Sequence, residues 1–285
     1  MKRSRGSRPT LELGQQSKLA HDSRATAPIT LLTDFGTSDY YVGAVKAVIL
    51  STNPAATLID ITHNIPPQDI QSAAFVLLAC YRSFPTNTIH AVIVDPGVGS
   101  VRRAIVVHAG DQIFVGPDNG VFSYVLDNEP DHRVFHITAE KYFQQPLSNT
   151  FHGRDVFAPI AAAISLGISL DSMGPEIFDP VRLQSLRPVI KNKKVKGRII
   201  HIDRFGNCVT NIAKSETVYG FTNAGLRVNG TRIESVRAYY GEGKPGKALF
   251  AIWGSAGFLE ISAQNRSAAT ILKAKRGDEV HLLMK

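Results

Sequence analysis

Residues 29–95 decide the fold and read ITLLTDFGTSDYYVGAVKAVILSTNPAATLIDITHNIPPQDIQSAAFVLLACYRSFPTNTIHAVIVD. Three short apolar runs, ITLLTD, ATLIDIT and TIHAVIVD, have the length and composition of buried strands. Between them, YVGAVKAVIL and IQSAAFVLLACYRSF repeat apolar residues at helical spacing. Strands that alternate with helices in this way predict a parallel sheet in an α/β domain.

The rest of the chain divides into two parts with different sequence patterns. Up to about residue 185, AIVVHAG and QIFVG predict a hairpin, and GRDVFAPIAAAISLG predicts a helix. After the basic stretch 191–198 come short β-rich segments, with a tight hairpin marked by Asn229-Gly230. We therefore predict the α/β class, with a mostly parallel sheet in an N-terminal α/β domain at 28–188 and a smaller all-β barrel at 189–285.

Composition and charge exclude several classes of function. The chain has 285 residues, a net charge of +8 and no apolar run long enough to cross a membrane. The positive charge lies in residues 1–27, predicted as a disordered basic leader, and in 191–198, predicted as a linker; residues 28–190 hold nine basic and fifteen acidic residues. We expect neither a nucleic-acid nor a membrane partner. The two cysteines are expected to be reduced thiols, and the protein to be cytoplasmic.

Ionisable residues follow the ends of the predicted strands. Asp34 follows the first strand and Asp95 the third, while Arg102 comes soon after Asp95 and His152 precedes a helix. Because the carboxyl ends of parallel strands meet at one edge of a sheet, we expect a shared site there. Each residue also has a structural explanation: Asp34 could cap the following helix, and Asp95-Pro96-Gly97 could be an ordinary turn.

Metal binding is an alternative at two places. Asp34, Asp39, Asp95 and His152 could be the ligands of a metal-dependent hydrolase. Asp60, His63 and Asp69 could also bind a metal, although a solvated loop explains them more simply. A different alternative is an RNA or nucleotide binder that uses the basic segments, whose affinity would fall steeply with salt.

A set of motifs covers everything after the leader: TDFG (33–36), DPGVGSVRR (95–103), GPDNG (116–120), TFHGRD (150–155), DRFGN (203–207) and GSAGFLEIS (254–262). In this order the set resembles the S-adenosyl-L-methionine (SAM) hydroxide adenosyltransferase family, which hydrolyses SAM and is related to SAM-dependent halogenating enzymes. The resemblance implies hydrolysis of SAM to adenosine and L-methionine by water or hydroxide that attacks the ribose C5′ atom. It also implies an α/β domain, a β-barrel and a homotrimer whose sites lie between subunits.

The resemblance implies roles for individual residues. Asp95, Arg102 and His152 would activate the water, without a metal or cofactor. Asp34 would bind the ribose diol and Asp39 the amino-acid end of the substrate. The second domain would supply further substrate-binding residues, Asp203, Phe205, Asn207, Ser255 and Asn265, the last within a segment at 264–268 that meets adenine.

The sequence departs from the halogenating relatives at the site. These enzymes carry tyrosine in place of Asp95 and His152, a hydroxyl residue in place of Val98, and arginine in place of Ala256. A desolvated halide beside an apolar side chain and a carboxylate is unfavourable, so we predict water as the nucleophile. A halogenase-type substitution and a SAM or adenosine sensor without turnover stay as alternatives.

Overall fold

The computed structural model describes residues 27–217, 226–233, 235–242 and 249–283. The predicted leader, apart from Ala27, lies outside these residues. The described chain forms two compact units. Unit 1 contains residues up to 68, 84–119 and 129–180; unit 2 contains 69–83, 120–128 and the residues from 181 onward. No helix in the described part is long and apolar enough to span a membrane.

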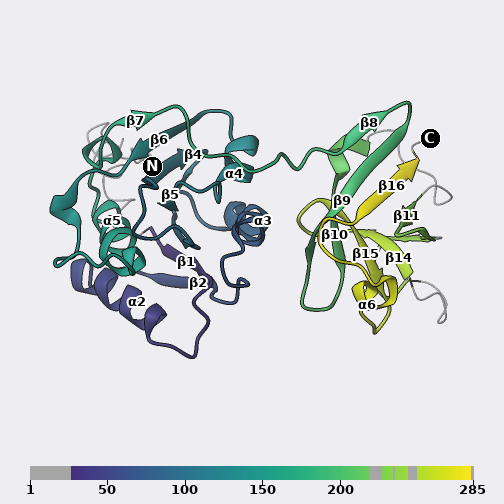
Figure 1. Ribbon diagram of the computed structural model, residues 1–285, viewed down its shortest axis with the longest axis horizontal. Helices are drawn as coiled ribbons and strands as arrows, with labels where there is room; N and C mark the ends of the chain where they lie inside the picture. Colours follow the sequence, from purple (N-terminus) through teal and green to yellow (C-terminus); the bar gives the residue numbers. More distant parts are fainter. Residues whose placement is uncertain (1–26, 218–225, 234, 243–248, 284–285) are drawn as a thin grey trace, which may run out of the picture. The chain divides into compact units, whose positions relative to one another are not determined.

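Unit 1 is built on a mixed seven-stranded sheet in the order β2-β1-β3-β5-β4-β6-β7 (Figure 1). Strands β2, β1, β3 and β5 pair in parallel with one another, whereas β4 pairs antiparallel with both β5 and β6, and β6 pairs antiparallel with β7. The strands are β1 (Ile29–Thr33), β2 (Leu58–Thr62), β3 (Ile89–Ile93), β4 (Ala104–Ala109), β5 (Gln112–Pro117), β6 (His132–His136) and β7 (Glu176–Ile177). The predicted strands and the β4–β5 hairpin are present.

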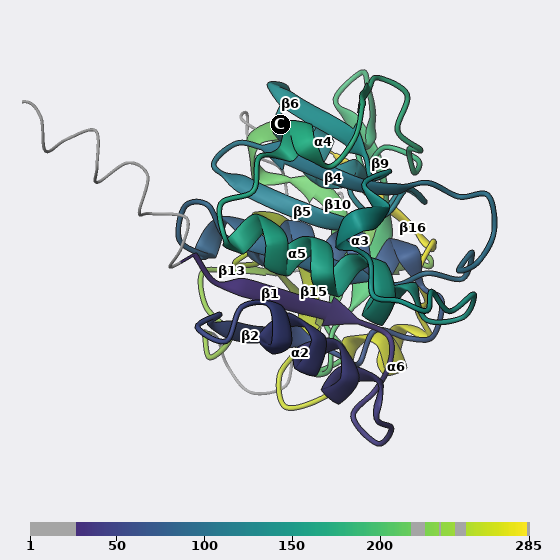
Figure 2. The same cartoon turned by 90° about the vertical axis from the view of Figure 1, so that its left-hand side faces the viewer.

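Two helices of unit 1, α2 (Tyr41–Thr52) and α5 (Ala158–Ser165), pack against each other beside the sheet (Figure 2). Their apolar faces share one buried cluster with β1 and β3. The side-chain amide of Asn53, the C-cap residue directly after α2, donates to Ser165 Oγ at 2.9 Å. A π-helical turn, Gly153–Phe157, leads into α5.

Unit 2 contains α3 (Ile70–Cys80) and α4 (Ser123–Asn128), although both lie in the sequence range predicted for the first domain. Asp69 caps α3 by accepting from Ser72 N at 3.0 Å. Phe75 of α3 stacks on His201, with ring centres 4.9 Å apart. The short α4 has no helical repeat from which it could have been predicted.

The strands of unit 2 form a mostly antiparallel, curled half-barrel. Its order is β12-β11-β16-β9-β10-β15-β14-β13, with β8 paired to β9, so the described strands leave it open. The strands are β8 (Val189–Lys191), β9 (Lys194–Ile202), β10 (Cys208–Ala213), β11 (Arg227–Val228), β12 (Thr231–Arg232), β13 (Val236–Arg237), β14 (Leu249–Trp253), β15 (Phe258–Ala263) and β16 (Glu279–Leu283). A short helix, α6 (Ala268–Leu272), interrupts the predicted all-β pattern.

The basic stretch 191–198 is not the predicted linker. It forms most of the β8–β9 hairpin, whose turn residues Asn192 and Lys193 have φ of 47° and 61°. Along β9 the burial alternates, with Val195 buried and Lys196 exposed. Lysines on the exposed side of a strand therefore account for the charge, and Lys196 pairs with Glu279 at 2.5 Å.

Candidate active site

The ends of β1 and β3 place two of the predicted carboxylates at one edge of the sheet. The strands pair in parallel, with Thr33 opposite Ile93, and Asp34 and Asp95 follow directly. Asp34 does not cap α2, whose N-cap residue is Tyr40, and the Tyr40 side chain makes no capping hydrogen bond. Its Oδ2 instead accepts from Gln68 N at 2.7 Å, so the chain after β2 fixes this carboxylate.

Arg102 joins Asp95 to His152. Its Nε donates to both Asp95 carboxylate oxygens, at 2.9 and 3.0 Å, and its Nη2 donates to Asp95 Oδ2. The same Nη2 lies 2.8 Å from His152 Nδ1. The side chains of Asp95 and Arg102 are only 7% and 11% exposed, which strengthens the attraction between their charges.

The contact with Arg102 assigns the proton of His152. A guanidinium group can only donate hydrogen bonds, so Nδ1 must be the acceptor and the neutral ring carries its proton on Nε2. Burial lowers the pKa of His152, and the positive charge of Arg102 lowers it further, against the opposing effect of Asp95 and Asp155. His152 is therefore neutral near pH 7.

The neighbouring Arg103 is directed elsewhere. Its guanidinium pairs with Asp118 at 2.6 Å and with Asp179 at 2.8 Å. Of the two adjacent arginines noted in the sequence, only Arg102 contacts the predicted site residues Asp95 and His152.

A cavity of about 380 Å³ in unit 1 contains most of the predicted residues of this unit. Asp34, Asp95 and His152 line it, together with Val98. The exposed Asp39 is not among the described lining residues, and neither is Arg102, which lies behind Asp95 and His152 and contacts both. Sequence reasoning missed its aromatic wall of Phe35, Tyr41 and Phe151, because rings that meet only in the fold leave no spacing signal in the sequence.

A second cavity, of about 740 Å³, lies in unit 2. Four predicted residues line it: Asp203, Phe205, Asn207 and Asn265. Asp203 organises the turn, since its Oδ1 accepts from the backbone N of Phe205 at 2.9 Å and of Asn207 at 2.8 Å. Ser255, in the exposed turn after β14, is not among the described lining residues.

Tyr240 and Phe250 also line this second cavity and were not predicted. Their rings meet edge to face, with centres 6.2 Å apart. The Tyr240 hydroxyl donates to the buried Glu260 at 3.0 Å, and burial, followed by the charge of Glu260, raises the pKa of Tyr240 to about 12. These residues come from separate segments, so only the fold brings them together.

The metal-ligand alternatives receive no support from the side-chain arrangement. Within the described residues no group of three or more His, Cys, Asp and Glu side chains has a geometry that could hold a metal. His63 is buried rather than solvated, with Nδ1 2.9 Å from Thr33 Oγ1. Asp69 forms an ion pair with Arg276 at 2.5 Å, so its carboxylate is engaged away from His63.

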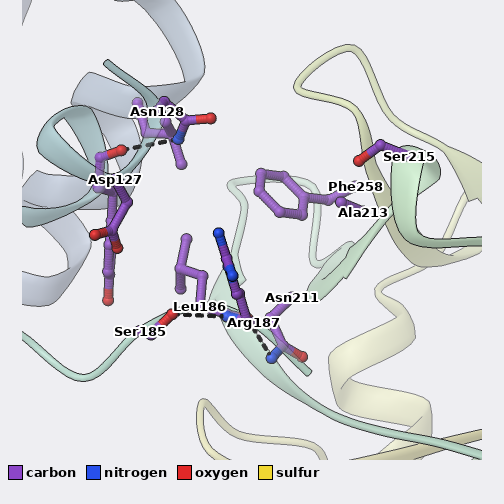
Figure 3. Close-up of a pocket in the computed structure, with 11 residues that line it drawn as sticks. Asp127, Asn128, Ser185, Leu186, Arg187, Asn211, Ala213, Ser215 and Phe258 are labelled. Atoms are coloured by element: carbon purple, nitrogen blue, oxygen red, sulfur yellow. Dashed lines mark hydrogen bonds between the residues drawn. The ribbon is translucent and has the colours of Figure 1, made fainter. Parts of the chain in front are cut away.

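Another cavity of unit 2, of about 410 Å³, contains none of the predicted site residues (Figure 3). Leu186 and Phe258 provide apolar walls. Two of its polar side chains already have partners: the Asn128 amide donates to Tyr124 O at 2.8 Å, and the Asn211 amide donates to Leu186 O at 2.6 Å. We assign no function to this cavity.

Comparison with known families identifies two matches along the chain. The SAM hydroxide adenosyltransferase N-terminal domain matches residues 29–174, and the C-terminal domain of the same family matches residues 197–281.

Curated relatives match over nearly the whole chain. An (R)-S-adenosyl-L-methionine hydrolase of Thermus thermophilus is 37% identical, over 90% of this chain and 99% of its own. A hydrolase of the same name from Methanocaldococcus jannaschii is also 37% identical, over 90% and 95%. A fluorinase of an Actinoplanes species is 25% identical, over 66% of this chain and 72% of its own. The crystal structure of an uncharacterized conserved protein from Thermotoga maritima has a TM-score of 0.84 and 37% identity, and covers 90% of this chain and 99% of that chain.

Proposed function

The chain belongs to the SAM hydroxide adenosyltransferase family and hydrolyses SAM to adenosine and L-methionine, and we propose that Asp95, Arg102 and His152 hold the attacking oxygen. The observation that supports these roles is the pair of contacts made by Arg102, to Asp95 and to His152 Nδ1, beside the cavity of unit 1.

The contacts favour a hydroxide as the nucleophile. With Nδ1 occupied by Arg102, His152 offers an N–H at Nε2, and Arg102 is also a donor, so both stabilise an oxygen that bears negative charge. In this tautomer His152 cannot take the proton from water. The attacking water gives its proton to solvent, and the hydroxide attacks C5′. The C5′–S bond breaks with its electron pair on sulfur, and the sulfonium leaves as neutral methionine.

Asp95 holds Arg102 rather than the substrate in this scheme. Because its two oxygens accept from the guanidinium, Asp95 fixes the direction of the remaining N–H groups. The metal-dependent alternative would need Asp95 and His152 as ligands of one metal, but the guanidinium of Arg102 lies between them. We therefore propose hydrolysis without a metal. We also propose water or hydroxide in preference to a halide, because an oxygen nucleophile can donate its hydrogen to the Asp95 carboxylate that lines the cavity, whereas a halide has no hydrogen to donate.

The substrate would contact residues of the 380 Å³ cavity of unit 1 and residues of the 740 Å³ cavity of unit 2. We propose that Asp34 binds the ribose diol and that Asp39 approaches the amino-acid end. The predicted contacts from unit 2 are those of Asp203, Phe205, Asn207, Ser255 and Asn265, of which all but Ser255 line the 740 Å³ cavity.

A single assay tests the reaction. The purified protein is incubated with SAM, with and without EDTA, and with added chloride or fluoride, and the nucleosides are separated by chromatography. Adenosine and methionine in equal amounts, unchanged by EDTA, support the proposal. Activity lost in EDTA and restored by a metal would favour the metal-dependent hydrolase, a 5′-halonucleoside the halogenase, and bound but intact SAM the sensor.

The homotrimer with sites shared between copies is also a proposal, and subunit mixing tests it. Asp95→Ala disables the part of the proposed site that unit 1 supplies, and Asn207→Ala disables the part that unit 2 supplies. If each site draws on two copies, an equal mixture reassembled from the two inactive variants regains about a quarter of the wild-type sites. No recovery, or a sedimentation mass of one chain, would contradict shared sites.

A cytoplasmic location is supported by one feature of the structure, the free thiols of Cys80 and Cys208. Burial raises the pKa of both thiols to about 11, so they stay protonated and unreactive at neutral pH.

A further inference from the structure

Asp155 is a buried carboxylate that the proposed hydrolysis does not use. Its side chain is 0% exposed, and it lies in the middle of the π-helical turn Gly153–Phe157. A carboxylate taken out of water is costly unless charged and polar partners surround it. Its partners therefore show which parts of the chain it holds together.

The partners of Asp155 tie the π turn to the chain that precedes it. Arg154 donates from Nε to Oδ1 at 2.6 Å and from Nη2 to Oδ2 at 2.9 Å. The backbone N of Ser148 donates to Oδ2 at 2.9 Å, and the backbone N of Gln144 donates to Asp155 O at 2.8 Å. Residues 144–148 are thus anchored to the turn that follows His152.

Arg102 contacts the residue before the π turn and the last residue of the turn. His152, directly before the turn, accepts from Arg102 Nη2 at 2.8 Å. Phe157, at the end, places its ring centre 5.2 Å from the guanidinium carbon. A shift of this turn would change both contacts together. Single π-helical turns inside helices occur frequently at functional sites.

We propose that Asp155 is a positioning residue for the hydrolysis: by anchoring the π turn, it holds His152 and Phe157 against Arg102. The inference rests on the proposed function. It differs from a purely structural role because the charge of Asp155 also acts on His152.

The charges around His152 set its pKa, so the pH dependence of kcat can separate the proposed role of Asp155 from a purely structural one. Arg102 lowers the pKa of His152, whereas Asp95 and Asp155 raise it. Asp34 and Tyr41 line the same cavity. If Asp155 becomes uncharged, one of the two opposing carboxylates is lost, and the pKa of His152 falls further. The acid limb of the kcat–pH profile should then move to lower pH.

The test compares Asp155→Asn with Asp171→Asn. Asp171 is also an arginine-paired aspartate of unit 1, but its side chain is 66% exposed. We expect Asp155→Asn to lower kcat about tenfold or more, to change KM for SAM by less than about threefold, and to move the acid limb to lower pH. Asp171→Asn should match the wild type in all three quantities.

A second variant covers the case in which Asp155→Asn does not fold. Arg154 is 35% exposed, and Arg154→Gln loosens the same anchor without altering Asp155. We expect this variant to lose kcat with KM retained. Both variants within about twofold of the wild-type kcat, or an acid limb unmoved in folded Asp155→Asn, would overturn the inference. Wild-type protein that forms no adenosine at any pH would instead reject the proposed function.

Discussion

Arg102 is the residue through which the other members of the proposed catalytic group act, since it donates to both Asp95 and His152. Arg102→Ala should lower kcat by about 100-fold or more, the usual effect of removing one donor to a developing negative charge. Binding of SAM, measured by calorimetry, should change little. Arg133→Ala, which removes an exposed arginine of the same unit, is the control and should keep full turnover.

His152 gives the reaction a defined pH dependence. The ring must be neutral to accept from Arg102, and its pKa is lowered by burial and by the Arg102 charge. Protonation of His152, which would break its contact with Arg102, should therefore occur only below pH 6.5, the ordinary value for histidine. The ring resonances of His152, followed by NMR across pH 4.5 to 8, measure this titration separately from the ionisation of the attacking water. A midpoint at or above the ordinary histidine value would contradict the neutral, Nε2-protonated assignment.

At the scale of elements, the loop after β3 and the segment before the π turn touch at Gly99. Its φ is +75°, and a Cβ there would lie 2.2 Å from the carbonyl oxygen of Asn149. Gly99→Ala should therefore push apart the two segments that carry Asp95 and His152, and lower kcat about tenfold or more. Gly167→Ala is a matched control, because Gly167 also has positive φ, +87°, but no atom within 4 Å. Equal kcat in both variants would show that the close contact has no role.

The predictable elements are those whose signal is local. The first three strands and α2 and α3 follow from apolar runs and helical spacing, and the placement of Asp34 and Asp95 follows from parallel strands alone. The contact between Arg102 and His152 joins residues 50 positions apart and depends on the π turn. No periodic pattern marks a two-residue strand such as β7, and lysines on one side of β9 resemble a linker until their alternation with buried residues is seen.

At the scale of the molecule, a buried histidine links the stability of unit 1 to pH. His90 in β3 is fully buried between sheet neighbours, stacks on Phe114 and has Nδ1 2.8 Å from Thr30 Oγ1. Burial lowers its pKa from 6.5 to about 4, so the unfolded chain takes up the proton first. This contribution is complete above pH 6.5 and is lost as the pH falls toward 4, by about 2 kcal/mol at pH 5.

Denaturant unfolding of wild type and His90→Gln at pH 7 and pH 5 measures this linkage. The variant should be less stable at pH 7, because it loses packing, but its stability should fall less between the two pH values. His281→Gln, at a histidine with a side chain 55% exposed, should follow the wild type. The same pH dependence in all three proteins would assign the effect to other groups.

The last residue of β14, Trp253, is the single tryptophan of the chain. Its indole is partly buried against the core of unit 2 and directly precedes the Gly254–Gly257 turn. Tryptophan emission is therefore an optical signal from unit 2 alone, whereas circular dichroism reports the helices of both units. Melting curves recorded by the two methods, without any label, show whether the units lose their structure in one cooperative step or in two.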